Sequence, residues 1–247
     1  MPENFPWETW IPFYLQNYAG QKIPGITHNL NNYVHILDMQ LSLLNSKTQS
    51  KPDSSISDYR SRIQKVNENT GNLMHFMQLN SNWSFYSQKE RIQTSIPDFI
   101  DWLVKFWDND LYCKHKITID TELGDNLPNL DLPAYTLTFC MEQPLANAVE
   151  ACRVKDAEQE QNIAIRAAAQ KNGVLFHLTS PTILEVAEKD AWNSGTTSKK
   201  GHLGLGLFLV RAVCRDLGWE AKIWKDHEGT NYELLIPEKK TSPKTES

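Results

Sequence analysis

The sequence predicts an α+β protein in which a helical hairpin precedes a mixed α/β region. Two segments with heptad spacing of apolar residues, within 30–44 and 59–77, indicate the hairpin. From about residue 88 the pattern changes to short strands alternating with amphipathic helices, which is typical of a domain built on a sheet. We therefore divide the chain into an N-terminal lead (1–24), the hairpin (25–85), the α/β domain (86–237) and a polar tail expected to be disordered (238–247).

The two hairpin helices share one spacing. In the first, steps of 4, 3, 4 and 3 residues separate Leu30, Val34, Leu37, Leu41 and Leu44. A polar segment with Pro52 predicts a loop over residues 45–57. In the second helix the same steps connect Tyr59, Ile63, Val66, Thr70, Leu73 and Met77. Because a lone hairpin cannot cover both apolar stripes, we expect two copies to pair into a four-helix bundle, which makes the protein a homodimer.

The α/β region contains alternating apolar segments and helical patterns in a regular order. We expect helices over 97–107, 135–153 and 205–217. We expect strands near 91 and over 116–123, 163–168, 174–178, 221–224 and 232–236. The segment 179–203 between them has no clear periodicity and predicts a long loop, and such a loop inside a compact domain is usually functional.

Composition excludes several classes of protein. The chain has 25 Lys plus Arg against 30 Asp plus Glu, a net charge of −5, which argues against nucleic acid as a partner. No apolar run approaches the roughly 20 residues of a membrane-spanning helix, so we expect no membrane insertion. The N-terminal residues do not have the pattern of a secretory signal. Four widely spaced cysteines, without a C-x-x-C pair, favour a cytoplasmic protein.

Three segments carry residue types suited to phosphoryl chemistry. The first, 25–32, places His28 just beside the apolar stripe, with Asn32 one turn further on the same face. Carried back from Leu30, the stripe would pass through positions 27 and 23, so His28 is expected to reach solvent. The second, 142–151, is helical, and the third, 195–207, places glycines before a helix, where free backbone N–H groups can meet phosphate oxygens.

In this order and spacing the three segments resemble the core of a two-component sensor histidine kinase. The His28 segment resembles the phosphoacceptor box of that family, and Asn147-Ala148 with Gln143 resembles its asparagine box. Thr196-Thr197-Ser198-Lys199 through Gly206-Leu207 resembles the lid and second glycine box, and Gly229-Thr230 the closing strand. The resemblance covers residues 25–237. It implies a dimerising helical bundle followed by a two-layer α/β sandwich of the GHKL ATPase type.

The resemblance also implies roles for individual residues. His28 would exchange a phosphoryl group with an aspartate on the receiver domain of a response regulator. Asn147 would hold a magnesium ion that bridges the phosphates of ATP, and Thr230 would line the adenine pocket. The other residues of the implied nucleotide site are Gln143, Thr179, Ser180, Thr197, Lys199, Gly201, Gly204 and Gly206.

Two departures from the family pattern bear on activity. Where the family has an aspartate that accepts the adenine amino hydrogen, followed by a glycine box, this chain has Thr179-Ser180-Pro181. A neutral hydroxyl offers a weaker hydrogen bond than a carboxylate. After His28 the family normally has an acid, whereas Asn29 can orient the ring but cannot take a proton. Asn32 matches the family position that directs water onto the aspartyl phosphate of a regulator.

These observations favour one hypothesis and leave others open. The leading one is a histidine-kinase-like signalling protein in which His28 relays phosphoryl groups to or from a response regulator, with ATP use reduced or lost. A second is an active ATP-dependent autokinase that uses Thr179 or Ser180 with a water, supported by the retained lid and its Thr197. A third is a non-catalytic pseudokinase or scaffold. A fourth alternative, a gyrase-like or chaperone ATPase, would not account for the heptad hairpin or for the histidine segment.

Overall fold

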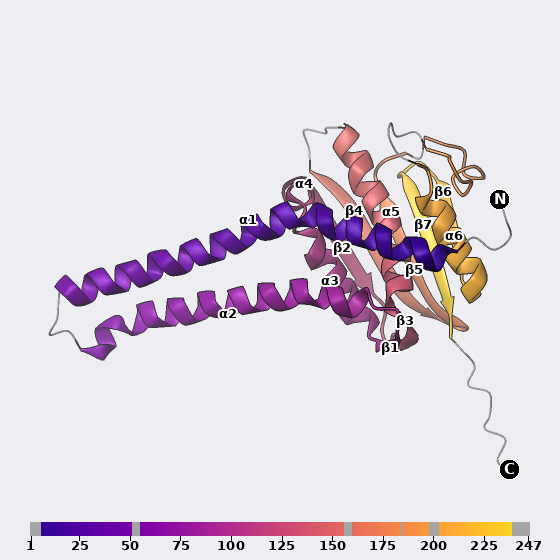
Figure 1. Ribbon diagram of the computed structural model, residues 1–247. Helices are drawn as coiled ribbons and strands as arrows, with labels where there is room; N and C mark the ends of the chain where they lie inside the picture. Colours follow the sequence, from indigo (N-terminus) through magenta and orange to yellow (C-terminus); the bar gives the residue numbers. More distant parts are fainter. Residues whose placement is uncertain (1–5, 51–54, 156–159, 184, 198–202, 239–247) are drawn as a thin grey trace, which may run out of the picture.

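A long helical hairpin projects from an α/β domain (Figure 1). The computed structural model describes residues 6–50, 55–155, 160–183, 185–197 and 203–238. The hairpin consists of α1 (Trp7–Ser50) and α2 (Ile56–Tyr86). The elements that follow are β1 (Arg91–Thr94), α3 (Ile96–Trp107), α4 (Leu111–Lys116), β2 (Ile117–Leu123), β3 (Leu130–Pro133), α5 (Ala134–Lys155), β4 (Gln161–Gln170), β5 (Gly173–Ser180), α6 (Gly206–Leu217), β6 (Glu220–Lys225) and β7 (Thr230–Pro237).

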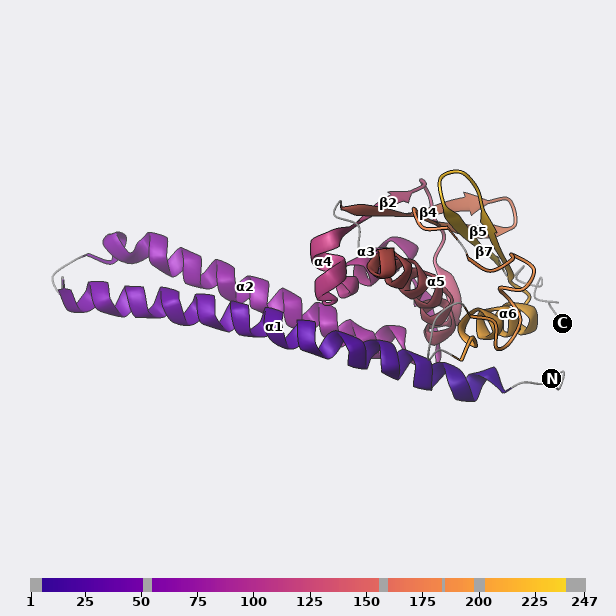
Figure 2. The same ribbon diagram turned by 90° about the horizontal axis from the view of Figure 1, so that it is seen from above.

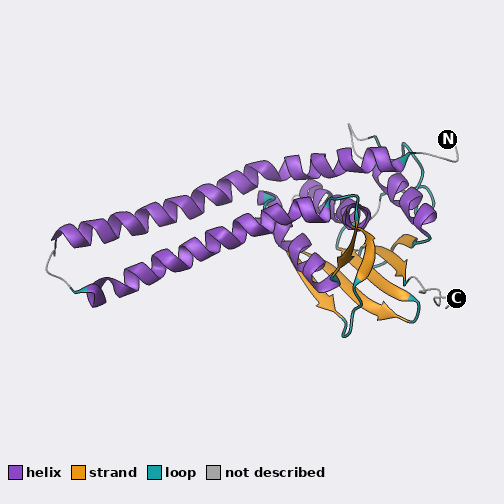
Figure 3. Ribbon diagram, turned by 60° about the horizontal axis from the view of Figure 1, so that its bottom comes forward, coloured by secondary structure: helices purple, strands orange, loops and turns teal. Residues whose placement is uncertain are grey.

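The domain is built on a mixed five-stranded sheet in the order β2-β4-β5-β7-β6. The β2 and β4 strands pair in parallel, and the other neighbours are antiparallel. A separate two-stranded sheet joins β1 and β3. Helices α3, α5 and α6 lie on one face of the large sheet, and α1 passes outside them, so that three layers follow one another (Figures 2 and 3). The alternating burial of β5, with Val174, Phe176 and Leu178 buried, marks the face that meets the helices.

The helix α1 differs from expectation at both ends. It begins at Trp7, within the predicted lead, and continues through Pro12 and Pro24. It also extends to Ser50, so the loop predicted from residue 45 starts later than expected. An interior proline costs about 3 kcal/mol or more in an isolated helix, but tertiary packing of a buried stripe supplies most of the stability of a helix in a protein. That stripe consists of Trp7, Ile11, Leu15, Tyr18, Lys22, Gly25 and Asn29.

The strands and helices predicted for the α/β region are confirmed, and two short elements are added. The helix α4 is capped by Asp110, whose carboxylate accepts a hydrogen bond from the Cys113 backbone N–H at 3.0 Å. The strand β3 has only four residues and pairs with β1. Elements this short carry too little periodicity to be found from sequence, because a single turn or two strand positions per face fit many patterns.

Along each helix of the hairpin, the predicted apolar stripe alternates between buried or half-buried positions and exposed positions. Within the hairpin, Tyr33 of α1 meets Phe76 of α2 with ring centroids 5.3 Å apart. Half of the predicted stripe turns inward and is buried or half-buried: Leu30, Leu37, Leu44, Tyr59, Val66 and Leu73. The residues between them remain exposed, namely Val34 (50%), Leu41 (51%), Ile63 (41%) and Met77 (58%). Each helix of the hairpin therefore buries alternate positions of its stripe and leaves the others at the surface.

Candidate functional site

The predicted phosphoacceptor lies on the exposed side of α1. His28 is exposed, and its Nε2 lies 3.2 Å from Nδ2 of Asn32, one turn further along the helix. An amide nitrogen has only hydrogens to offer, so in this contact Asn32 donates and Nε2 of His28 accepts. With the amide placed in this way, the lone pair of the imidazole is on Nε2, and it accepts the hydrogen bond from Asn32.

Asn29 points into the protein rather than toward the His28 ring. It is about 100° around the helix from His28 and is buried against the α/β domain. Its Nδ2 donates to Oδ1 of Asn109 at 3.3 Å, and its Oδ1 accepts from Nζ of Lys114 at 2.9 Å. In this geometry Asn29 joins α1 to the junction of α3 and α4, and the hydrogen bond to the His28 ring comes from Asn32.

Asn109 lies at the point where three elements meet. Besides its bond with Asn29 of α1, its Nδ2 donates to Oδ1 of Asn80 on α2 at 2.9 Å and to the carbonyl of Phe106 on α3 at 3.1 Å. A Cβ at Gly25 would collide with the Asn109 carbonyl oxygen, so α1 reaches this close only because residue 25 is glycine. Sequence reasoning missed Asn109 because nothing local distinguishes a junction asparagine from a surface one.

On the predicted phosphate side, the structure brings Gln143 and Gly206 into contact. Gln143 is buried, its Oε1 accepts a hydrogen bond from the Tyr18 hydroxyl, and its amide fills the space that a Cβ at Gly206 would need. Asn147 is one turn further along α5 and half-buried. The amide oxygen of Gln143, a residue that the resemblance places in the nucleotide site, is therefore bonded to a side chain of α1.

The predicted glycine loop before α6 is only partly described. Gly204 has a φ of 60°, which favours glycine, and its carbonyl accepts a hydrogen bond from the Gly195 N–H at 3.1 Å. Thr197 is exposed. Lys199 and Gly201 lie outside the described residues. The described part of the loop thus folds back on itself just before the first turn of α6.

The residues predicted for the adenine side are hydrogen-bonded within the protein. Ser180 of β5 lies opposite Thr230 of β7, and both contact Thr182: the Ser180 and Thr182 hydroxyls are 2.8 Å apart, and the Thr230 hydroxyl donates to the Thr182 carbonyl at 2.6 Å. The Thr179 hydroxyl donates to Oδ1 of Asn231 at 3.2 Å. The structure therefore brings these residues together and uses their hydroxyls in a network of their own.

A buried charged cluster, absent from the sequence-based site, joins α1 to α3 and α5. Lys22 is almost fully buried, with Nζ 3.0 Å from the centroid of the Trp107 ring and 3.6 Å from Oδ2 of Asp110. The indole N–H of Trp107 donates to Oε2 of Glu142 at 2.9 Å. Burial raises the pKa of Glu142 to about 7, although the nearby Lys22 ammonium opposes this shift. Burial also lowers the pKa of Lys22.

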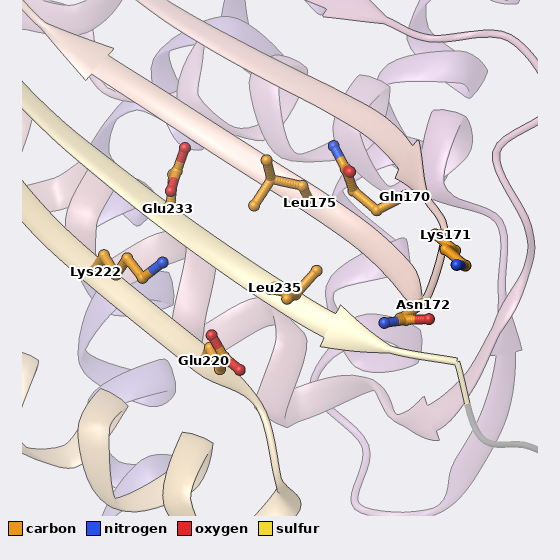
Figure 4. Close-up of a pocket in the computed structure, with 8 residues that line it drawn as sticks. All are labelled: Gln170, Lys171, Asn172, Leu175, Glu220, Lys222, Glu233 and Leu235. Carbon is orange, nitrogen blue, oxygen red and sulfur yellow. The ribbon is translucent and has the colours of Figure 1, made fainter.

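The hollow drawn in Figure 4 lies elsewhere, on the face of the sheet that the helices leave open. It has a volume of about 310 Å³ and is lined by Gln170, Lys171, Asn172, Leu175, Glu220, Lys222, Glu233 and Leu235. It contains none of the predicted site residues. Among the described residues, no cluster of three or more His, Cys, Asp or Glu side chains could hold a metal ion.

Comparison with known proteins identifies the fold. No protein-family model matches the sequence, and no curated protein matches it. Among solved structures, the catalytic domain of the histidine kinase ThkA matches with a TM-score of 0.50 and 18% identity, over 60% of this chain and 95% of that domain. The matched part of the chain has the fold of a histidine kinase catalytic domain. The predicted α+β class and the GHKL-type sheet are thereby confirmed.

Two further similarities extend over more of the chain at lower scores. The histidine kinase AdeS of Acinetobacter baumannii matches with a TM-score of 0.47 and 13% identity, over 83% of this chain and 98% of that one. A bacterial phosphotransferase matches with a TM-score of 0.42 and 12% identity, over 89% of this chain and 96% of that one. Within the described part of this histidine kinase fold, no helix is both long and apolar enough to cross a membrane.

Proposed function

We propose that this protein takes part in two-component signalling by exchanging a phosphoryl group between His28 and an aspartate on the receiver domain of a response regulator, with ATP use reduced or lost. The observation that carries the proposal is the contrast between an exposed His28, whose Nε2 accepts a hydrogen bond from the exposed Asn32, and a nucleotide side whose polar groups are hydrogen-bonded within the protein.

The proposed step needs little from this chain beyond a presented imidazole. The lone pair on Nε2 attacks the phosphorus of the aspartyl phosphate, the N–P bond forms as the P–O bond breaks, and the aspartate leaves as a carboxylate. The reverse reaction passes the phosphoryl group back to a regulator. A magnesium ion in the acidic pocket of the receiver domain would neutralise phosphate charge in this step. The hydrogen bond from Asn32 leaves the ring proton on Nδ1, and this hydrogen bond must be released before the Nε2 lone pair attacks.

Several residues implied for ATP already have hydrogen-bond partners within the protein. The Oε1 of Gln143 accepts from the Tyr18 hydroxyl, and the Gln143 amide is packed on Gly206. Thr179, Ser180 and Thr230 use their hydroxyls within the protein, and no carboxylate stands at the adenine position. Binding a nucleotide would require these buried hydrogen bonds to be exchanged, each at a loss of about 1–3 kcal/mol if left unpaired. This supports reduced ATP use.

We further propose that two copies of the chain associate through the hairpin. Val34 and Leu41 of α1, together with Ile63 and Met77 of α2, are exposed apolar residues of the two stripes. In a four-helix bundle, these are the positions that a second hairpin covers. The proposal gives the divided stripe of the hairpin a single physical reason.

The test uses receiver domains from the source organism, phosphorylated with labelled acetyl phosphate, and in parallel γ-labelled ATP with magnesium. We expect acid-labile label to reach the chain from at least one receiver domain and not from ATP. The label should disappear in His28→Ala and persist in His35→Ala, since His35 is an exposed histidine of the same helix.

Other outcomes decide between the remaining hypotheses. Label from ATP that depends on His28 would identify an active autokinase and overturn the loss of ATP use. No label from any receiver domain would overturn the relay and leave a scaffold. Accelerated loss of phosphate from the receiver, abolished by Asn32→Ala and without label on His28, would indicate a regulator phosphatase instead.

A further inference from the structure

His28 belongs to the same continuous helix that packs on the ATPase-like domain. At the start of α1, Trp7 stacks on Tyr135 with ring centroids 6.3 Å apart, and its indole N–H donates to Oδ2 of Asp216 at 2.7 Å. Two turns later the ring of Tyr14 packs edge-on against that of Phe139, with ring centroids 5.8 Å apart. The buried stripe of α1 thus contacts the first turns of α5 and the end of α6, and α1 passes across both helices (Figure 2).

The buried stripe of α1 continues to the residues on either side of His28. Lys22 lies over Trp107, Gly25 touches the Asn109 carbonyl, and Asn29 is bonded to Asn109 and Lys114. Because Asn109 also holds Asn80 of α2, both hairpin helices are fixed to the domain next to the phosphoacceptor. A movement of the domain relative to His28 would break buried contacts over six turns of α1.

The docked helix also sets how far His28 is from the implied phosphate site. Tyr18 contacts Gln143, and His28 follows ten residues later, which corresponds to about 15 Å along the helix axis. Asn147 is four residues beyond Gln143, which corresponds to about 6 Å along the axis of α5. Even if this whole shift pointed toward His28, about 9 Å would remain between Asn147 and His28 along the helix axis. Phosphoryl transfer needs the reacting atoms about 3–3.5 Å apart. A phosphate held at Gln143 and Gly206 is therefore out of reach of His28 in the same chain.

We propose that residues 7–29 of α1 and the ATPase-like domain move as one body, in which Gly25, Asn29 and Asn109 are positioning residues for His28. In this body the phosphoryl group on His28 comes from a donor outside the chain, because the chain's own nucleotide side cannot approach it. The inference rests on the proposed relay and adds its geometry. His28 exchanges its phosphoryl group while residues 7–29 of α1 stay packed on the ATPase-like domain, and α1 is not released during the reaction.

A pair of glycines in α1 provides the test. Gly25→Ala places a methyl group against the Asn109 carbonyl, whereas Gly20→Ala meets nothing within 4 Å. Both changes favour helix, so a difference between them reports the docking of α1. We expect Gly25→Ala to lower the transfer rate at saturating phosphorylated receiver about tenfold with little change in KM, and Gly20→Ala to stay within twofold of the unmodified protein. Asn29→Ala removes the side-chain bonds without the collision and should act in the same direction.

The rigid body is measured directly by pulsed electron paramagnetic resonance. Spin labels on cysteines introduced at Gln21 of α1 and Arg211 of α6, both exposed positions, report the position of this part of α1 relative to the domain, and the four native cysteines are buried. Labelled protein is diluted with unlabelled protein so that only pairs within one chain contribute. We expect one narrow distance that does not change with magnesium and a non-hydrolysable ATP analogue or with phosphorylated receiver. Gly25→Ala should broaden it, and Gly20→Ala should not.

The outcomes separate this inference from the proposed function. A second distance population in the unmodified protein on adding nucleotide, or full transfer activity in Gly25→Ala despite a broadened distance, would overturn the inference and leave the relay intact. If no receiver domain phosphorylates His28, the relay fails, and the distance measurement alone decides whether the helix and domain form one body. A narrow, unchanging distance together with a tenfold slower Gly25→Ala would establish both.

Discussion

The two halves of α1 have the same secondary structure in different surroundings. Residues 7–29 lie on the α/β domain with one buried residue in every three or four. Residues 30–50 run beside α2, away from the sheet (Figure 1), and none of them is buried. Val34 and Leu41 are about half exposed, whereas Ile11 and Leu15 are inaccessible.

The difference indicates that the domain stabilises residues 7–29 of α1, whereas residues 30–50 depend on the hairpin. The first half of α1 is held by the core of the domain and fixes the position of His28. The second half forms a hairpin that is complete on one side only, as expected of a surface that pairs with a second copy. Stability of the first half should be independent of protein concentration, whereas that of the second half should depend on it.

The largest effect is expected from truncating a buried residue of the first half. Ile11→Ala removes a fully buried side chain and should lower the free energy of unfolding by about 2–5 kcal/mol. Leu41→Ala, at a half-exposed position of the second half, should change it by only about 0.5 kcal/mol in dilute solution. Urea denaturation followed by circular dichroism measures both. Equal losses for the two variants would contradict the division of α1.

The buried acid at the contact of α1 with the domain predicts a pH dependence. The pKa of Glu142 is about 7 when folded, against 4.5 for an ordinary glutamate, so the folded state retains a proton that the unfolded chain releases. This contribution is fully present below about pH 4.5 and is lost as the pH rises to about 7. Relative to the unmodified protein, Glu142→Gln should therefore gain on the order of 1–3 kcal/mol of stability across this window. Parallel pH–stability curves would contradict the assignment.

A charge in the exposed stripe of the second half should weaken association. Leu41→Glu would place a carboxylate among the apolar positions that we propose to be covered in the dimer, and it should raise the dimer dissociation constant at least tenfold. Analytical ultracentrifugation over a concentration series measures this. Ser42→Glu carries the same charge on another face of the helix and should leave the constant unchanged. Identical behaviour of the two variants would argue against a hairpin dimer.

The smallest effect is expected at the beginning of the first half. Asp216→Ala removes the acceptor of the Trp7 indole N–H at 2.7 Å and should destabilise the protein by about 0.5–1 kcal/mol. The acid sits in the last turn of α6, where a negative charge is unfavourable, and this limits the loss. Thermal unfolding measures the change. The control is Asp101→Ala, which breaks an exposed ion pair with Lys105 on one helix and should change the free energy of unfolding very little.

Much of the fold was predictable because its patterns are local. The heptad steps from Leu30 and from Tyr59 identify two helices without reference to anything else in the chain, and alternation along residues 174–178 identifies β5. The exposure of His28 follows from its place beside the stripe. The stripe itself was extended wrongly toward the N-terminus: Ile23 is exposed, and Lys22, Gly25 and Asn29 are buried. A lysine and an asparagine do not reveal their burial, because their partners are supplied by distant segments.

The sequence by itself determined the class of fold, the order of its elements, the solvent-facing histidine and the neutral Thr179-Ser180-Pro181 segment where the resemblance leads one to expect an acid. These features depend on residue type and on periodicity within one element. Only the tertiary structure decided that residues 7–24 continue α1, that Tyr18 is bonded to Gln143, and that Asn109 joins Asn29 to the second hairpin helix. These hydrogen bonds join residues between 29 and 125 positions apart, and they form only when folding brings the polar groups together away from water.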